Sequence, residues 1–320
     1  MPGYLVWLNA RLWEMKRLLK PTGSIYVHLD WHAVHYVKVE MDKIYGADNF
    51  FNEIVWQKIR SSKAQSGQFG NVHDTLLAYG KSPIRFFNLQ YVPLAEERVS
   101  THYSNTEAGT GRRFMLDNFT QAGQGPPRSF GGRVLEPPNG KHWIWTQEKI
   151  DQGLEEGRIV FSPSGMPRVK RYLDESKGNP VEDIWCDVAP VNSQARERIG
   201  YPTQKPESLL ERIIVGSTNK GDIVADFFCG GGTTPAVAQR LNRRWIACDQ
   251  SRIAVAITAD RVSKAVEETI GMMFPVPDFT VEHWGIYEAP KLEQYPVERF
   301  REFVVRAFGG RPEGVSGAIH

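Results

Sequence analysis

The sequence predicts an α/β fold built on a doubly wound parallel sheet. Apolar positions at helical spacing alternate with short apolar strands over residues 1–85, which is the order typical of α/β domains. Much later, the apolar run 223–225 leads through the turn Asp-Phe-Phe-Cys-Gly-Gly-Gly-Thr-Thr at 226–234 into a helical pattern. A glycine turn between a buried strand and a helix is where doubly wound sheets bind ligands.

The elements of the first 85 residues follow from apolar spacing and from the positions of Gly and Pro. Leucines recur at helical spacing until Pro21 and Gly23 stop the first helix. Two later strand-like runs are joined by a polar loop, which favours an antiparallel pair. The predicted elements are helices over 5–19 and 31–45 and strands over 24–29, 52–58 and 75–79.

The last third of the chain predicts a candidate nucleoside site. Strand 244–248 follows the glycine turn and ends in Asp249, about 20 residues beyond the turn. A carboxylate in this position can accept both hydroxyls of a ribose. The chain has no Gly-Lys-Ser/Thr after the turn, which argues against a phosphate-binding P-loop. The alternative is a plain tight turn without a ligand.

The six residues that directly precede a predicted helix over 207–217 form a second motif. The run Tyr-Pro-Thr-Gln-Lys-Pro at 201–206, then this helix, then Asp-x-Phe-x-Gly-x-Gly-Thr-Thr at 226–234 resembles the cofactor half of the β-class DNA amino-methyltransferases. The resemblance implies the methyltransferase variant of the doubly wound sheet. It also implies S-adenosylmethionine (AdoMet) as the methyl donor and adenine N6 or cytosine N4 of double-stranded DNA as the acceptor.

The family order also explains why the glycine turn comes late, because the catalytic half and the recognition segment precede it. The resemblance implies four parts: 1–85, an incomplete catalytic half; 86–200, an irregular target-recognition insert; 201–270, the AdoMet-binding half; and 271–320, a carboxyl-terminal extension. In the last part, apolar residues predict a strand over 278–282 and a helix over 297–308.

The resemblance assigns the cofactor residues one by one. It implies that the ribose lies on Asp249, the adenosine along Gly230 and Gly232, and the methionine end near Asp226, Thr203 and Lys205. The implied cofactor-binding set is Thr203, Gln204, Lys205, Pro206, Asp226, Phe228, Gly230, Gly232, Thr233, Thr234 and Asp249.

The segment 86–200 is rich in Gly, Pro, Arg and aromatic residues, and its periodicity is poor. It holds 14 Lys/Arg and 15 Asp/Glu, a net charge of −1, so it is no generic electrostatic DNA clamp. One interpretation is an irregular insertion with solvated charges and buried tryptophans. The other, which the resemblance favours, is recognition of DNA through local basic residues. These are Arg112, Arg113, Arg168, Lys170 and Arg171.

The family's catalytic signature, Asp/Asn/Ser-Pro-Pro-aromatic, is absent. Only 125–128 and 136–139 hold paired prolines, and neither has the required flanking residues. We therefore expect a truncated chain without the catalytic strand, whose sheet position between strands 223–225 and 24–29 stays empty. The helix faces over 4–19 and 235–241 would then be partly uncovered.

This absence shapes the functional hypotheses. The leading one is a site-specific adenine-N6 DNA methyltransferase of the restriction-modification or orphan type, with this chain an inactive fragment. The alternatives are a cytosine-N4 enzyme, a catalytically dead module that binds AdoMet and DNA, or an unrelated dinucleotide enzyme. The resemblance places Asp30 near the target-base pocket.

A metal site is a further alternative, because His28, Asp30, His32 and His35 leave a predicted strand together. No second ligand cluster completes it, so we expect no metal.

Composition limits the compartment and the partners. The three cysteines are uneven in number and widely spaced, which predicts reduced thiols in a cytoplasmic protein. The apolar runs are too short to span a bilayer. A homodimer or a restriction subunit remains open as a partner.

Overall fold

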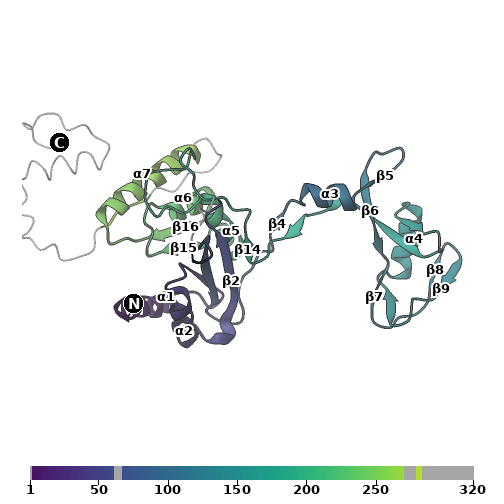
Figure 1. Ribbon diagram of the computed structural model, residues 1–320, viewed down its shortest axis with the longest axis horizontal. Helices are drawn as coiled ribbons and strands as arrows, with labels where there is room; N and C mark the ends of the chain where they lie inside the picture. The colour runs from purple at the N-terminus through teal and green to yellow at the C-terminus, as the bar shows by residue number, and fades with distance from the viewer. Residues whose placement is uncertain (1, 61–66, 270–278, 283–320) are drawn as a thin grey trace, which may run out of the picture. The chain divides into compact units, whose positions relative to one another are not determined.

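The computed structural model describes residues 2–60, 67–269 and 279–282. The chain divides into two compact units (Figure 1). The first unit comprises Met1–Asn88 and Glu182–His320, and the second comprises Leu89–Val181. The second unit is thus inserted in sequence between the two segments of the first.

The elements of the first unit agree closely with those expected from apolar spacing. The predicted helix over 5–19 and strand over 24–29 are confirmed, and the helix expected from residue 31 begins at Val34. The elements are α1 (Pro2–Leu18), β1 (Ser24–Leu29), α2 (Val34–Tyr45), η1 (Ala47–Asn49), β2 (Phe50–Gln57), β3 (His73–Gly80), β14 (Ile184–Trp185), α5 (Glu207–Ser217), β15 (Ile223–Asp226), α6 (Thr233–Arg240), β16 (Arg244–Ala247) and α7 (Arg252–Thr269).

The larger sheet of the first unit has the order β1-β3-β2-β14. β3 is antiparallel to both of its neighbours, and Leu77 lies opposite Val27 of β1 and Glu53 of β2. Every residue of β3 from Asp74 to Gly80 is buried, as expected for a central strand covered on both faces. The predicted antiparallel pair is confirmed.

The helices α1 and α2 cover one face of this sheet. Leu8 and Leu12 of α1 pack with Met41 of α2 and with Leu77 and Tyr79 of β3. Because side chains alternate along a strand, the odd-numbered residues of β1 join this core and the even-numbered ones face the opposite side.

The opposite face lies against α5. The hydroxyl of Tyr26 on β1 is 2.7 Å from Oγ of Ser217 at the end of α5. Asn88 donates from its backbone to the carbonyl of Gly216 (2.8 Å) and from its side chain to that of Val215 (3.0 Å). The carboxyl end of α5 is therefore fixed beside β1.

The strands β15 and β16 form a separate, two-stranded parallel sheet. On one face, Val224 and Trp245 pack against Val237 of α6. On the other face, Ile223 and Ile246 are 44% and 52% exposed. Within the described ranges, β1 pairs with β3 alone and β15 with β16 alone, so no strand ladder joins the two sheets.

The expectation of a partly uncovered helix over 235–241 is wrong, because residues 235–239 are all buried. The covering element is α7, which we did not predict. Its buried positions include Ala254, Thr258, Val262 and Ala265. Because several of these residues are small or polar, the hydrophobic periodicity of the sequence is too weak there to predict a helix. On α1, by contrast, Val6 and Trp13 are exposed.

The second unit is more regular than its sequence indicates. Its largest sheet has the order β11-β12-β6-β5. Phe119, Phe130, Trp143 and Val169 pack in its core, so Trp143 is a buried core residue. The strands have two to six residues, too few for a clear period. The elements are β4 (Tyr91–Val92), α3 (Glu96–His102), β5 (Asn105–Thr106), β6 (Arg113–Asn118), β7 (Thr120–Ala122), β8 (Arg128–Phe130), β9 (Arg133–Leu135), β10 (Lys141–Trp143), α4 (Gln147–Glu155), β11 (Ile159–Phe161), β12 (Pro167–Tyr172), η2 (Leu173–Glu175) and β13 (Asn179–Pro180).

Little of the carboxyl-terminal part is described. Residues 279–282 are not in a strand, so the strand expected over 278–282 is wrong for these positions. Residue 278 and the predicted helix over 297–308 lie outside the described residues. No helix in the described part of the chain is both long enough and apolar enough to cross a bilayer.

The core assigned between α1, α2 and the sheet leads to a prediction about the free energy of unfolding. Met41 is fully buried in α2, while Val39 on the same helix is 53% exposed. Met41→Ala should lower the free energy of unfolding by about 2–5 kcal/mol, because it leaves a cavity. Val39→Ala, the matched control, should change it by less than about 0.5 kcal/mol. Equilibrium urea unfolding measures both, and equal effects would contradict the assigned core.

Candidate functional site

The glycine turn lies at the carboxyl ends of two adjacent parallel strands. Asp226 ends β15 and is in register with Ala247, two residues before Asp249. The turn is tied to the next strand, because the N–H of Cys229 donates to the carbonyl of Cys248 (3.0 Å). The two carboxylates therefore lie at the edge of the sheet where doubly wound folds bind their ligands.

The carboxylate of Asp249 is held by two backbone groups. Its Oδ2 accepts a hydrogen bond from the N–H of Gly230 at 3.0 Å. Its Oδ1 accepts one from the N–H of Ser251 at 2.8 Å. A carboxylate offers about four acceptor positions, so two remain for hydroxyl donors. The bonds fix the orientation of Asp249 beside the turn.

The carboxylate of Asp226 accepts two hydrogen bonds that hold the turn. Its Oδ1 accepts from the N–H of Phe228 (3.0 Å) and its Oδ2 from the hydroxyl of Thr234 (2.5 Å). Burial raises the pKa of Asp226, these two bonds oppose the shift, and the charge of Asp249 adds to it. The two carboxylates thus repel each other, and a cationic group between them would relieve this repulsion.

The glycines of the turn are required by close packing. Gly230 and Gly232 have φ values of 51° and 72°, a left-handed region that favours glycine. A Cβ on Gly232 would lie 2.7 Å from Oγ1 of Thr258, and one on Gly231 would lie 2.7 Å from Cδ1 of Ile199. The protein itself therefore fills the space beside these two glycines.

The run 203–206 leads directly into α5 and contacts the turn. Thr233 Oγ1, at the start of α6, donates to the carbonyl of Lys205 at 3.1 Å. The Gln204 amide donates to the carbonyl of Glu197 (2.6 Å) and accepts from the N–H of Ile199 (3.0 Å). Pro206 is the buried residue before α5, whereas Thr203 is exposed.

An ion-pair network around the buried Arg261, which we did not predict, connects these segments. Arg261 of α7 is 7% exposed and donates to the carbonyl of Gly231 (3.2 Å), to Thr233 Oγ1 (2.8 Å) and to Glu207 Oε1 (2.6 Å). Arg240 pairs with the other oxygen of Glu207. Only tertiary structure reveals this network, since its members are far apart in sequence.

Aromatic rings extend from the turn to α1. The ring of Phe228 is 46% exposed and lies 5.4 Å from that of Trp7, centroid to centroid. Trp7 is stacked with Tyr4 at 6.3 Å, and the Arg11 guanidinium lies 4.0 Å from the Trp7 ring centroid. The predicted cofactor residue Phe228 thus has an apolar surface open to solvent beside the turn.

The histidines at the end of β1 and in the residues that follow it do not converge as a metal site would. His28 Nε2 is 3.0 Å from Asp74 Oδ2 on β3. Asp30 is exposed, and its carboxylate accepts from the N–H of His32 (3.1 Å) and lies 3.0 Å from His32 Nδ1. His35 is exposed on α2. In the ranges that the structure describes, no three His, Cys, Asp or Glu side chains could hold a metal ion together.

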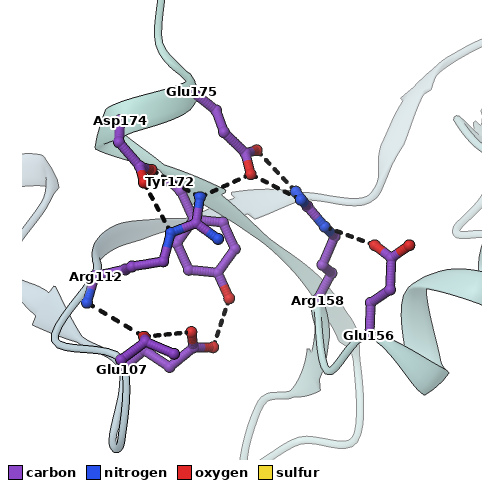
Figure 2. Close-up of polar contacts among 8 residues, drawn as sticks. Glu107, Arg112, Glu156, Arg158, Tyr172, Asp174 and Glu175 are labelled. Atoms are coloured by element: carbon purple, nitrogen blue, oxygen red, sulfur yellow. Dashed lines mark hydrogen bonds and ion pairs between the residues drawn. The ribbon is translucent and has the colours of Figure 1, made fainter.

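The predicted DNA-binding residues of the second unit all have protein partners. Arg112 donates to Asp174 (2.8 Å) and Glu175 (2.8 Å) and lies 3.8 Å from the centroid of the Tyr172 ring (Figure 2). Arg158, which we did not single out, donates to the same Glu175 at 2.7 and 2.8 Å (Figure 2). Hydrogen bonds from these two arginines lower the pKa of Glu175 to about 2.

The other four predicted DNA-binding residues differ in how far a protein partner neutralises their positive charge. Lys170 is mostly buried and bonds to Glu107 at 2.9 Å. Arg113 donates to the carbonyls of Tyr103 and Val99, and Arg168 donates to the Asn118 side chain. The side chain of Arg171 is 47% exposed, and its partner Asp117 is 3.5 Å away, which is longer than the carboxylate pairs of Arg112 and Lys170.

Comparison with known proteins agrees with this site. A sequence model described as DNA methylase matches residues 1–260. The type II methyltransferase M.EcaI of Enterobacter cloacae is 32% identical over 81% of this chain and 57% of its own length. The Mod subunit of the type III restriction-modification enzyme StyLTI of Salmonella typhimurium is 26% identical over 75% of this chain and 38% of its own length.

Among solved structures, the complex of M1.HpyAVI with SAM is 15% identical, with a TM-score of 0.43, over 82% of this chain and 85% of that one.

The chain spans about half the length of the curated relatives that it matches. The methylase match extends over most of the sequence, through both the larger sheet and the glycine turn. The chain therefore belongs to the N6/N4 DNA methylase family.

Proposed function

We propose that the chain holds AdoMet and serves the transfer of its methyl group to adenine N6 in double-stranded DNA, with cytosine N4 as the alternative acceptor. The observation that carries the proposal is the carboxylate of Asp249, which Gly230 and Ser251 orient beside the glycine turn. A fixed carboxylate with two free acceptor positions fits the two hydroxyls of a ribose.

The charges around the turn suit the amino-acid end of AdoMet. Asp226 and Asp249 repel each other, which favours a cation near them, and Lys205 supplies a positive charge for a carboxylate. In this proposal the adenosine lies along Gly230 and Gly232. The residues that shape or support the site are Thr203, Gln204, Pro206, Phe228, Thr233 and Thr234.

The acceptor side of the reaction needs groups that the sequence lacks. An exocyclic amine is conjugated with its ring and is a weak nucleophile, so oxygen atoms must accept its hydrogens while a ring stacks on the flipped base. Asp30 is the one acidic residue for which we propose a place near that pocket. The proposed roles are therefore a donor site in 201–270 and an incomplete acceptor site in 1–85.

We propose that the insert over 86–200 recognises DNA. Its basic side chains already bind protein carboxylates or carbonyls, so a DNA phosphate would have to displace one of these groups. Among the members that pair with a carboxylate, Arg171 has the longest ion pair, and its side chain is 47% exposed, which makes it the first candidate for a phosphate contact. Arg112, Arg113, Arg168 and Lys170 complete the proposed set.

We also propose a restriction subunit or a second copy of the chain as partner, and the cytoplasm as location. The StyLTI relative is named as the Mod subunit of a restriction-modification enzyme, which supports the first of these partners. The three free cysteines suit a reducing compartment.

The cofactor proposal predicts a loss of affinity on removal of the Asp249 carboxylate. Asp249→Ala should weaken AdoMet binding roughly 10- to 100-fold, because a charged hydrogen-bond acceptor is lost. Isothermal titration calorimetry measures it, and Asp260→Ala on the exposed face of α7 is the matched control. Equal affinity in wild type and Asp249→Ala, or a preference for NAD over AdoMet, would sink the assignment.

The recognition proposal predicts that Arg171 and Arg112 behave differently. Arg171→Ala should reduce the salt dependence of DNA binding by about one unit of log–log slope and leave the melting temperature almost unchanged. Arg112→Ala should instead lower the melting temperature, since it leaves Asp174 and Glu175 without one partner. If neither variant changes the affinity or its salt slope, the insert is structural.

The absent acceptor motif predicts that the 320 residues alone transfer no methyl group to DNA. One preorganised contact in a transition state contributes about 10²–10³ in rate, and two contacts and a stacking ring are missing. Labelled AdoMet with mixed-sequence duplex DNA tests this, and nucleoside analysis separates N6-methyladenine from N4-methylcytosine. Adding a segment with the Asp/Asn/Ser-Pro-Pro-aromatic motif should restore transfer. Transfer by the chain alone would reveal an unrecognised catalytic motif, and failure of both would favour the dead module.

A further inference from the structure

Two exposed arginines lie in a short segment that leads toward α5. The segment over 192–199 belongs to the first unit, and not to the compact second unit that carries the five basic residues proposed above. It includes a turn in which the N–H of Arg198 donates to the carbonyl of Ala195 (3.0 Å). Arg196 and Arg198 are both exposed, so this turn holds two guanidinium groups at the surface of the first unit.

Glu197, between the two arginines, fixes the segment to the start of α5. Its Oε2 accepts a hydrogen bond from the N–H of Glu207 (2.8 Å) and lies 4.0 Å from the guanidinium of Arg261. Its carbonyl accepts one from the side-chain amide of Gln204 (2.6 Å). Because both the backbone and the side chain of Glu197 are bonded, the residues on either side of it have a defined position.

The same segment lies against the glycine turn. A Cβ on Gly231 would be 2.7 Å from Cδ1 of Ile199, the residue after Arg198, and a Cβ on Gly230 would be 3.0 Å from the ring of Tyr201. The arginines are therefore close in sequence to residues that contact the site proposed for the methyl donor. Methyl transfer requires the acceptor base in near-attack contact with the donor, so the backbone beside a flipped base passes close to this turn.

The positive charge of the two arginines is not balanced by the protein. Glu207 pairs with Arg240 and Arg261. Glu197 shares Arg261, so these two carboxylates face two other guanidiniums. Over the ranges that the structure describes, no carboxylate forms an ion pair with either exposed arginine. The segment therefore presents two uncompensated positive charges to the solvent.

We propose that Arg196 and Arg198 bind phosphates of the DNA backbone beside the target base. This inference rests on the proposed function and adds a DNA contact on the first unit to the five residues proposed on the second. A guanidinium matches a phosphate through two parallel hydrogen bonds. A phosphate here forms its ion pairs without displacing a protein carboxylate, whereas one at Arg112 or Lys170 would have to displace one.

The test measures how the 320-residue chain binds a labelled mixed-sequence duplex, by fluorescence anisotropy over a range of salt concentrations. The double variant Arg196→Ala/Arg198→Ala should bind about tenfold more weakly, as expected for two solvent-exposed ion pairs. The log–log salt slope should fall by about two units, one for each phosphate contact. The affinity for AdoMet, measured by calorimetry, should stay within about twofold of the wild type.

A charge-matched variant separates phosphate binding from net charge. Arg17→Ala/Lys43→Ala removes two positive charges from α1 and α2, where each pairs with a nearby glutamate, and should leave the salt slope nearly unchanged. Arg196→Lys/Arg198→Lys keeps both charges and should keep most of the slope.

Melting temperatures show whether each variant is folded. Arg196→Gln/Arg198→Gln, which keeps polar side chains of similar reach, carries the test if the alanine variant does not fold. It should show the same weaker binding and the same lower salt slope.

The outcomes are distinct. If the alanine variant keeps the affinity and slope of the wild type, or if the charge-matched variant loses as much slope, the inference is overturned. It is also overturned if the alanine variant weakens AdoMet binding instead, because the arginines then serve the cofactor. If the wild type binds AdoMet but no DNA, the inference fails while the cofactor proposal stands. If it binds neither, the proposed function itself fails.

Discussion

The buried guanidinium of Arg261 is the interaction on which the arrangement of the glycine turn depends. It connects α7 to the Gly231 carbonyl, to the first residue of α6 and to Glu207 at the start of α5. A buried charge is tolerated only when it is paired and hydrogen-bonded, and here both conditions are met. The three segments that meet at the turn are thereby held in one relative position.

The turn also carries a concentration of negative charge. Asp226 and Asp249 place two carboxylates at the carboxyl ends of β15 and β16, and the charge of Asp249 helps to raise the pKa of Asp226. Under the proposed function, this pair would attract the ammonium and sulfonium groups of AdoMet, whereas it would repel a dinucleotide pyrophosphate. The two carboxylates therefore favour the first of two ligand classes that share a glycine turn and a strand-end acid.

The sequence predicted most helices and strands of the first unit because they are periodic and bounded by Gly or Pro. It also predicted the glycine turn, whose spacing is local. It could not predict the partners of Asp74 or Glu207, because these pairs join residues between 16 and 54 positions apart. Nor could it predict α7, whose buried positions include alanine and threonine, or the short strands of the insert.

The second unit shows why a count of basic residues is a poor guide to nucleic-acid recognition. Several of its positive side chains are paired with carboxylates in β6, η2 and the neighbouring loops, and Arg112 and Arg158 share Glu175. A DNA phosphate at such a pair must replace an existing carboxylate, so the gain is the difference between two ion pairs. Among the carboxylate pairs of Arg112, Lys170 and Arg171, that of Arg171 with Asp117 is the longest, at 3.5 Å. Under the proposed function, this pair would be the first that a DNA phosphate opens, and the nearly neutral insert would bind arbitrary sequences weakly.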